Sequence, residues 1–264
     1  MGAQLSDRTR QSYSREIRKF EADFSQMFGM SAEDAPEDRL VEYLKALFES
    51  KNVSTALRVK VAAIKRWYRD LHGKDLNFNQ PLPPARTEPI RILSSQELET
   101  LFHHTRHHVC GLVIRLIYAS GLRLQEVIQV RVKDVDLENL RITARNEKGE
   151  PSHSTIFSGV LRYDIMRQAH GKEPGDFLFS LRRNGERGPM ARRTIQSFLA
   201  RAVDELGLEG KITAQTLRDN FAIHLLRQGI DLRHIMRTMG FKNMRSLDRY
   251  VDYIKNDLAL KSPL

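Results

Sequence analysis

The sequence predicts a mainly α-helical protein with a small β-sheet, organised as two domains. Apolar residues recur at three- and four-residue spacing along much of the 264-residue chain, a pattern typical of amphipathic helices. Residues 134–158 instead hold short apolar runs on both sides of a turn-rich hexapeptide, which favours short strands. Four prolines within residues 81–89 indicate a linker, so we expect a domain at 1–73, a linker at 74–92 and a second domain at 93–264.

Three helices are predicted for the first domain, over residues 7–28, over 37–50 and from about Ser54 to Gly73. Gly73 is a suitable end for the third helix because glycine adopts the left-handed backbone conformation without a steric penalty. Each helix carries an apolar stripe, and the stripes consist of Tyr13, Ile17, Phe20 and Phe24, of Leu40, Tyr43, Leu44 and Leu47, and of Leu57, Val61, Ile64 and Tyr68.

The second domain is predicted to begin with a helix capped by Ser94. Its hydroxyl and the carboxylate of Glu97, three residues later, form the capping-box pattern that precedes an apolar helix. Strands are expected on either side of the turn at 146–151. Further helices are predicted at 107–119, 123–131, 159–170, 191–206, 215–228, 231–239 and 243–254.

The charge balance points to a polyanionic partner. Lys plus Arg number 43 against 33 for Asp plus Glu, which gives a formal net charge of +10. Nucleic acid and an anionic membrane surface are the partners that such a charge favours. The lone Cys110 excludes an intramolecular disulfide and a cysteine-rich zinc site, and the chain has no run of about 18 apolar residues that could span a bilayer.

Four residues at the ends of predicted elements carry the candidate chemistry. Arg123 follows a glycine turn into a helix, Lys148 lies at the tip of the strand-turn-strand segment, and Arg218 lies in the first turn of a helix. Tyr250 follows in a short polar helix. Taken singly, each has an ordinary alternative, because such cations are usually solvated and such a tyrosine usually serves packing.

Their sequence context resembles the tyrosine recombinase family, most closely its Xer-type and phage-integrase branch. The segment ASGLRLQEV at 119–127 resembles the first arginine motif, and TLRDNFAIHLL at 216–226 resembles the second arginine box. Residues 147–149, EKG, match the lysine-bearing hairpin turn, and Tyr250 follows at the spacing of the nucleophile. The first domain looks like the family's helical core-binding domain on the basis of Thr9, Tyr13 and Phe20.

The resemblance implies a fold, a reaction and a partner. It implies a SAM-like helical core-binding domain and an α+β catalytic domain that form a C-shaped clamp on double-stranded DNA. It implies site-specific recombination through a 3′-phosphotyrosine, with Tyr250 as nucleophile, Arg123 and Arg218 holding the phosphate, and Lys148 as general acid. No metal or other cofactor is expected, nor a membrane. The chain would act in the cytoplasm and assemble as a tetramer on paired recombination sites.

Two active-site positions depart from the family pattern. Gln215 stands where His or Lys is usual, and Phe241 stands where His or Trp is usual. Asp219 also replaces a common His. A glutamine carries no proton near neutral pH, and a phenylalanine offers no hydrogen bond. Two alternatives therefore stay open: a DNA-binding or architectural protein with weakened catalysis, and a type IB topoisomerase-like activity that relaxes DNA without synapsis.

Further residues have a functional and an ordinary interpretation. Glu126 either orients Arg123 or forms a surface pair with it, and Tyr253 is more compatible with packing than with nucleophilic attack. The histidine cluster could bind a metal, but a solvated or DNA-facing surface is the better interpretation; it comprises His103, His104, His107 and His108. Phosphate contacts are expected from basic residues of the third helix and of the segment after residue 180, namely Lys65, Arg66, Arg69, Arg182, Arg183, Arg192 and Arg193.

Overall fold

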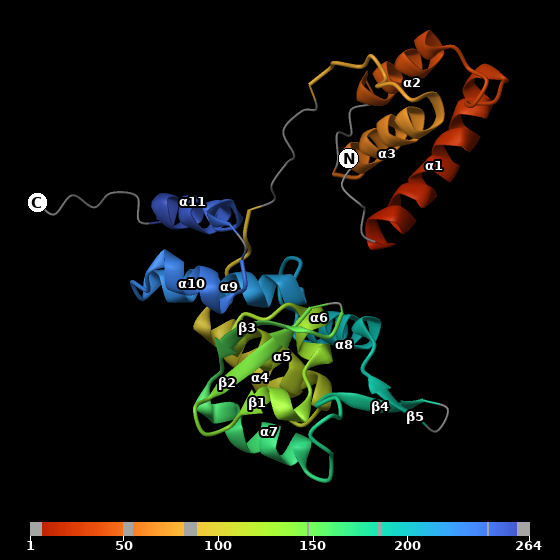
Figure 1. Cartoon of the computed structure of the whole chain (residues 1–264). Helices are drawn as coiled ribbons and strands as arrows, with labels where there is room; N and C mark the ends of the chain where they lie inside the picture. The colour runs from red at the N-terminus through yellow and green to blue at the C-terminus, as the bar shows by residue number, and fades with distance from the viewer. Residues whose placement is uncertain are drawn as a thin grey trace, which may run out of the picture. The chain divides into compact units, whose positions relative to one another are not determined.

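Two compact units, Met1–Glu88 and Pro89–Leu264, make up the computed structural model. The boundary falls inside the stretch 74–92 that the sequence suggests as a linker. Figure 1 shows the course of each unit. The residues that the structure describes are 7–49, 55–81, 89–146, 148–183, 186–241 and 243–257.

The first unit consists of the helices α1 (Asp7–Phe28), α2 (Glu37–Glu49) and α3 (Thr55–His72). They bury most of the apolar stripes that the periodicity predicts, and the ring of Phe20 is fully buried in this core. Tyr13 is half-buried and is not part of the core, and Ile17 and Leu47 are partly buried against it. The centroid of the Phe20 ring lies 5.2 Å from that of Tyr43 on α2 and 5.3 Å from that of Trp67 on α3, both edge to face. Aromatic pairs in this arrangement hold the three helices together beyond their burial of apolar area.

In the second unit, eight helices lie in the described part of the chain. The helix α5 (Val109–Ser120) is apolar along most of its length and packs against four others, α4, α6, α8 and α9. The Ser94–Glu97 capping box predicted at the start of the domain is present. The remaining helices are α4 (Ser95–Thr105), α6 (Leu124–Gln129), α7 (Arg162–Ala169), α8 (Arg192–Glu205), α9 (Ala214–Arg227), α10 (Leu232–Thr238) and α11 (Asp248–Asp257).

The predicted strands form an antiparallel sheet of order β1-β2-β3, consisting of β1 (Val135–Asp136), β2 (Arg141–Arg145) and β3 (Pro151–Ile156). Ile142 lies opposite Thr155, and both side chains are buried. The register shifts between Ala144 and Arg145, next to the turn that joins β2 to β3. In Figure 1 this sheet lies over α5, and contacts between β3 and α10 link it to the C-terminal helices.

A second hairpin, which the sequence pattern does not predict, follows residue 180: β4 (Ser180–Arg183) and β5 (Glu186–Pro189) pair antiparallel. The segment lacks the alternation of apolar and polar residues that marks a half-buried strand, and the hairpin is formed by backbone hydrogen bonds, which any non-proline residue can make.

Two predicted helices also begin differently. Residues Gly159–Leu161 form a 3-10 turn ahead of α7, and Met244–Ser246 form another ahead of α11. Among the described residues, none of the helices combines the length and apolarity that crossing a membrane requires.

The turn between α5 and α6 depends on Gly121. Its φ of +65° lies in the left-handed region, where a side chain costs conformational energy. A Cβ at this position would also lie only 2.4 Å from Cδ1 of Phe221 on α9. The glycine thus permits both the turn and the close approach of α5 to α9.

We expect Gly121→Ala to lower the free energy of unfolding by about 2–5 kcal/mol, as the sum of left-handed strain and overpacking. Gly171→Ala is the matched control, since its φ is +70° and nothing lies within 4 Å of an added Cβ. That variant should lose only about 1–2 kcal/mol. Guanidinium denaturation followed by circular dichroism measures both, and equal losses would contradict the packing argument.

Candidate active site

The buried guanidinium of Arg218 lies at the centre of the site. Arg218 is 1% exposed on α9, and its two terminal nitrogens donate to the carbonyl oxygens of Gly121 and Met239. The second of these bonds is 2.7 Å long. Burial and then the charge of Arg123 lower the pKa of Arg218 to about 10, which still leaves it charged at neutral pH. A fixed positive charge is therefore built into the protein interior.

Arg123 provides a second, more accessible positive charge. It is the N-cap residue of α6, and its side chain is 44% exposed. Its backbone N–H donates to Oε2 of Glu126 over 2.7 Å, and its Nη1 donates to Oε1 over 2.8 Å. Oε2 of Glu126 also lies 3.7 Å from Nη1 of Arg218. Glu126 thus contacts both arginines, which favours the orienting role over that of a plain surface pair.

Phe241 brings the two arginines and the tyrosine into one cluster. The guanidinium carbon of Arg218 lies 5.0 Å from the centre of the Phe241 ring, and that of Arg123 lies 5.8 Å from it. The ring of Tyr250 lies 6.2 Å from Phe241, centroid to centroid. Cations near an aromatic face are attracted to its quadrupole, so Phe241 stabilises the guanidinium groups without offering a hydrogen bond.

Tyr250 lies on α11 and is 1% exposed. Its hydroxyl donates a 2.7 Å hydrogen bond to Oδ1 of Asp219, the residue after Arg218. The same oxygen accepts from Nε2 of Gln215 over 2.8 Å, while Oδ2 accepts from Arg249 over 3.0 Å. Burial raises the pKa of Tyr250 and the Asp219 carboxylate raises it further, so the phenol is protonated at neutral pH.

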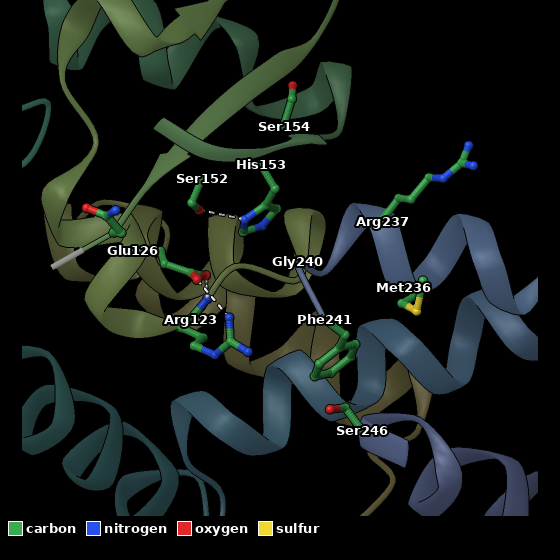
Figure 2. A pocket seen from close by; sticks show the side chains of 11 residues that line it. Arg123, Glu126, Ser152, His153, Ser154, Met236, Arg237, Gly240, Phe241 and Ser246 are labelled. Atoms are coloured by element: carbon green, nitrogen blue, oxygen red, sulfur yellow. Dashed lines mark hydrogen bonds and ion pairs between the residues drawn. The ribbon is translucent and has the colours of Figure 1, made fainter. Parts of the chain in front are cut away.

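An open cleft of about 750 Å³ lies beside this cluster. Figure 2 shows Arg123 and Glu126 on one side of it, Phe241 on another, and His153 of β3 above them. Arg237 of α10 adds a further positive charge to the lining. A cleft with guanidinium groups at its wall suits an oxyanion such as a phosphodiester.

His153 is a further residue of the site, and the sequence does not predict it. Its imidazole lines the cleft and packs so closely on Gly240 that a Cβ there would lie 2.4 Å from the ring. Nδ1 is 3.0 Å from the Ser152 hydroxyl, whereas Nε2 is buried and has no hydrogen-bond partner in the described part of the chain. Burial lowers the pKa of His153, and the nearby charges of Arg218 and Arg123 lower it further. No motif or period marked this residue.

Lys148 lies on the exposed turn between β2 and β3. The backbone N–H of Lys148 donates to Oδ1 of Asn146 over 2.9 Å, and Gly149 adopts a φ of +81°. Asn146 lines the cleft, whereas Lys148 is not among the described residues of its lining. The structure thus brings Arg123, Arg218, Phe241 and Tyr250 together. Lys148 does not join them: it follows Asn146, which lines the cleft, by two positions in the sequence. Glu147 lies outside the described residues.

The residues predicted to contact DNA lie on α3, on α8 and on β4. On α3, Lys65 donates to the carbonyl of Phe78, and two arginines form ion pairs, Arg66 with Asp70 and Arg69 with Asp75. Exposed side chains at the start of α8 belong to Arg192 and Arg193. The side chains of Arg182 and Arg183, on β4, are not described.

The histidine cluster is used for local packing and capping. His104 lies 2.9 Å from Glu205, and His108 accepts from the N–H of Cys110 and stacks on Phe198. Within the described residues, no group of three or more His, Cys, Asp or Glu side chains is arranged to hold a metal ion.

The comparisons with known proteins agree with this geometry. The chain is 26% identical to the tyrosine recombinase XerC of Syntrophus aciditrophicus, over 96% of this chain and 90% of that one. It is 25% identical to the tyrosine recombinase XerA of Saccharolobus solfataricus, over 78% of this chain and 66% of that one. The XerH recombinase bound to palindromic difH in a post-cleavage complex shares the fold with a TM-score of 0.71 at 19% identity, over 94% and 77% of the two chains.

The match to a family description covers both arginine motifs and the tyrosine. Residues 91–256, most of the second unit, match the phage integrase family. The site, the fold and the relatives thus lead to one conclusion: the chain belongs to the phage integrase family of tyrosine recombinases.

Proposed function

We propose that Tyr250 attacks a DNA phosphodiester held by Arg123 and Arg218, so that the chain cleaves and rejoins duplex DNA at specific sites through a 3′-phosphotyrosine. The observation that carries this proposal is the cluster around Phe241. Arg123 and Phe241 line one open cleft, and the buried Arg218 and Tyr250 pack near the same Phe241 ring. The names of the XerC and XerA relatives, both tyrosine recombinases, support the same reaction.

The two arginines have different tasks in this mechanism. Negative charge grows on the non-bridging oxygens as the tyrosine oxygen approaches phosphorus, and preorganised donors stabilise it most effectively where water is excluded. Arg218 supplies a fixed charge because its hydrogen bonds to two carbonyls hold it in place. Arg123, which is partly exposed, reaches the phosphate from the wall of the cleft.

Lys148 protonates the leaving group. As the bond from Tyr250 to phosphorus forms, the bond from phosphorus to the 5′ oxygen breaks, and the ammonium group of Lys148 gives that oxygen its proton. The covalent intermediate retains the ester, so a 5′-hydroxyl can attack it and release Tyr250. The exposed turn around Gly149 allows the lysine to approach the bound strand.

Gln215 and Phe241 do not take over the proton chemistry of the residues usual at their positions. The Gln215 amide donates to Asp219, and Phe241 supports the guanidinium groups. Stabilisation of the transition state therefore rests on Arg123, Arg218 and Lys148. Recombination is favoured over binding alone and over simple relaxation because the relatives whose names state an activity are recombinases.

The partner is double-stranded DNA, and a net charge of +10 supports association with it. We place the reaction in the cytoplasm, on paired sites bound by four copies of the chain. Neither a metal nor a nucleotide enters any of the steps above.

Tyr250→Phe removes the hydroxyl and keeps the ring, so it should abolish the covalent adduct and leave DNA affinity nearly unchanged. The assay uses a nicked duplex that the chain selects from a randomised pool, with adducts resolved in denaturing gels. Tyr253→Phe is the matched control and should retain the adduct. An adduct that survives Tyr250→Phe and is lost with Tyr253→Phe would reverse the assignment.

Arg123→Lys keeps the charge but loses the planar pair of donors, so single-turnover cleavage should fall by about 10²–10³. Binding to the same duplex, measured by fluorescence anisotropy, should change little. Arg167→Lys, at an exposed position of α7, is the control for the substitution itself. Cleavage that is equally fast in both variants would remove Arg123 from the phosphate site.

Lys148→Ala should slow cleavage of a normal strand by about 10²–10⁴, the usual contribution of a general acid. A strand with sulfur in place of the bridging 5′ oxygen needs less protonation of its leaving group, so it should be cleaved at nearly equal rates by both proteins. Single-turnover rates on the two strands test this. A defect of the same size on the sulfur strand would show that Lys148 is not the proton donor.

A further inference from the structure

The carboxylate of Asp219 is held in one orientation at the hydroxyl of the nucleophile. Its side chain is 6% exposed and lies on α9, directly after Arg218. Oδ1 accepts from Tyr250 and from Gln215, and Oδ2 accepts from Arg249. These three donors fix both oxygens, so the phenolic proton already points at a charged acceptor.

The proton of Tyr250 must leave during the reaction. The raised pKa of Tyr250 means that the phenolate is not present beforehand at neutral pH. The charged groups that face this hydroxyl are Asp219 and Arg218 of α9 and Arg249 of α11. Neither guanidinium can accept a proton, and the amide of Gln215 is no base. Asp219 is the basic member of this group.

We propose that Asp219 is the general base that receives the proton of Tyr250; this step rests on the proposed function. As the Tyr250 oxygen bonds to phosphorus, its proton moves to Oδ1 of Asp219, the bond from phosphorus to the 5′ oxygen breaks, and that oxygen takes its proton from Lys148. On rejoining, Asp219 returns the proton to the departing phenol. An aspartate that accepts a hydroxyl proton during phosphoryl transfer also serves protein kinases.

Two departures from the family pattern, Asp219 and Gln215, are then explained together, because they are hydrogen-bonded to each other. Asp219 stands directly after Arg218, where a His is common, and Gln215 stands three residues before Arg218, where a His or Lys is usual. The 2.8 Å bond from the Gln215 amide to Oδ1 holds the carboxylate in place without competing for the proton. We therefore assign Gln215 as a positioning residue for Asp219.

The decisive variant is Asp219→Asn in the full chain, which keeps the shape of the side chain and removes its basicity. Single-turnover cleavage of the selected nicked duplex should fall by about 10²–10⁴, with nearly unchanged affinity. Asp252→Asn, at an exposed position of α11, is the matched control and should cleave at the wild-type rate. If Asp219→Asn cleaves as fast as the wild type or faster, the carboxylate only restrains the tyrosine and the proposal is overturned.

Chemical rescue separates a base from a structural role. Replacing Tyr250 with trifluorotyrosine gives a phenol that is more acidic than that of tyrosine and so depends less on a base. This residue should raise the rate of Asp219→Asn by about tenfold or more and that of the wild type much less. A slow Asp219→Asn chain that trifluorotyrosine does not rescue would overturn the proposal.

The contact can also be tested without DNA. The pKa of trifluorotyrosine at position 250, followed by fluorine NMR, should be lower in Asp219→Asn than in the otherwise unchanged chain, because a neutral amide no longer opposes the phenolate. An unchanged pKa would overturn the contact itself. Wild-type chain that forms no adduct would overturn the proposed function and the base with it, whereas an adduct formed equally well by Asp219→Asn overturns only this inference.

Discussion

A single buried guanidinium constrains the catalytic unit. Arg218 donates to two backbone carbonyls, that of Gly121 directly after α5 and that of Met239 directly after α10. Transferring a charge from water into the protein interior costs free energy unless hydrogen bonds and an opposite charge compensate it. Glu126 supplies part of that opposite charge. The turn before α6, the end of α10 and the helix α9 therefore have to keep one arrangement, and the walls of the cleft follow from it.

The charged and aromatic residues of the site therefore differ in exposure and in the contacts that they make. Arg218 holds its charge inside the protein, whereas the more exposed Arg123 lines the cleft. Phe241 stabilises both cations through its ring and takes no part in proton transfer. In the mechanism that we propose, the proton chemistry falls to Lys148 on the hairpin turn and to the carboxylate of Asp219 on α9.

Local patterns were sufficient for most elements of the fold. The stripes of α1 to α3 and the Ser94 cap depend on residues within a few positions of one another, so the sequence shows them directly. The hairpin β4–β5 could not be predicted from the sequence, because backbone groups form its pairing and its side chains show no apolar periodicity. His153 escaped for a related reason: its place beside Gly240, 87 positions along the chain, results from the packing of β3 against α10.

The sequence by itself determined the family and indicated the candidate reacting groups, because the two arginine motifs, the lysine turn and Tyr250 are short patterns in a fixed order along the chain. Only the tertiary structure decided which partners those groups have. It showed that Gln215 and Tyr250 share one oxygen of Asp219, and that Arg218 is buried against carbonyls far away in the chain. Gln215 and Asp219 are four residues apart on α9, but Tyr250 and the two carbonyls come from other segments that meet only when the core is packed, so no spacing in the sequence records those contacts.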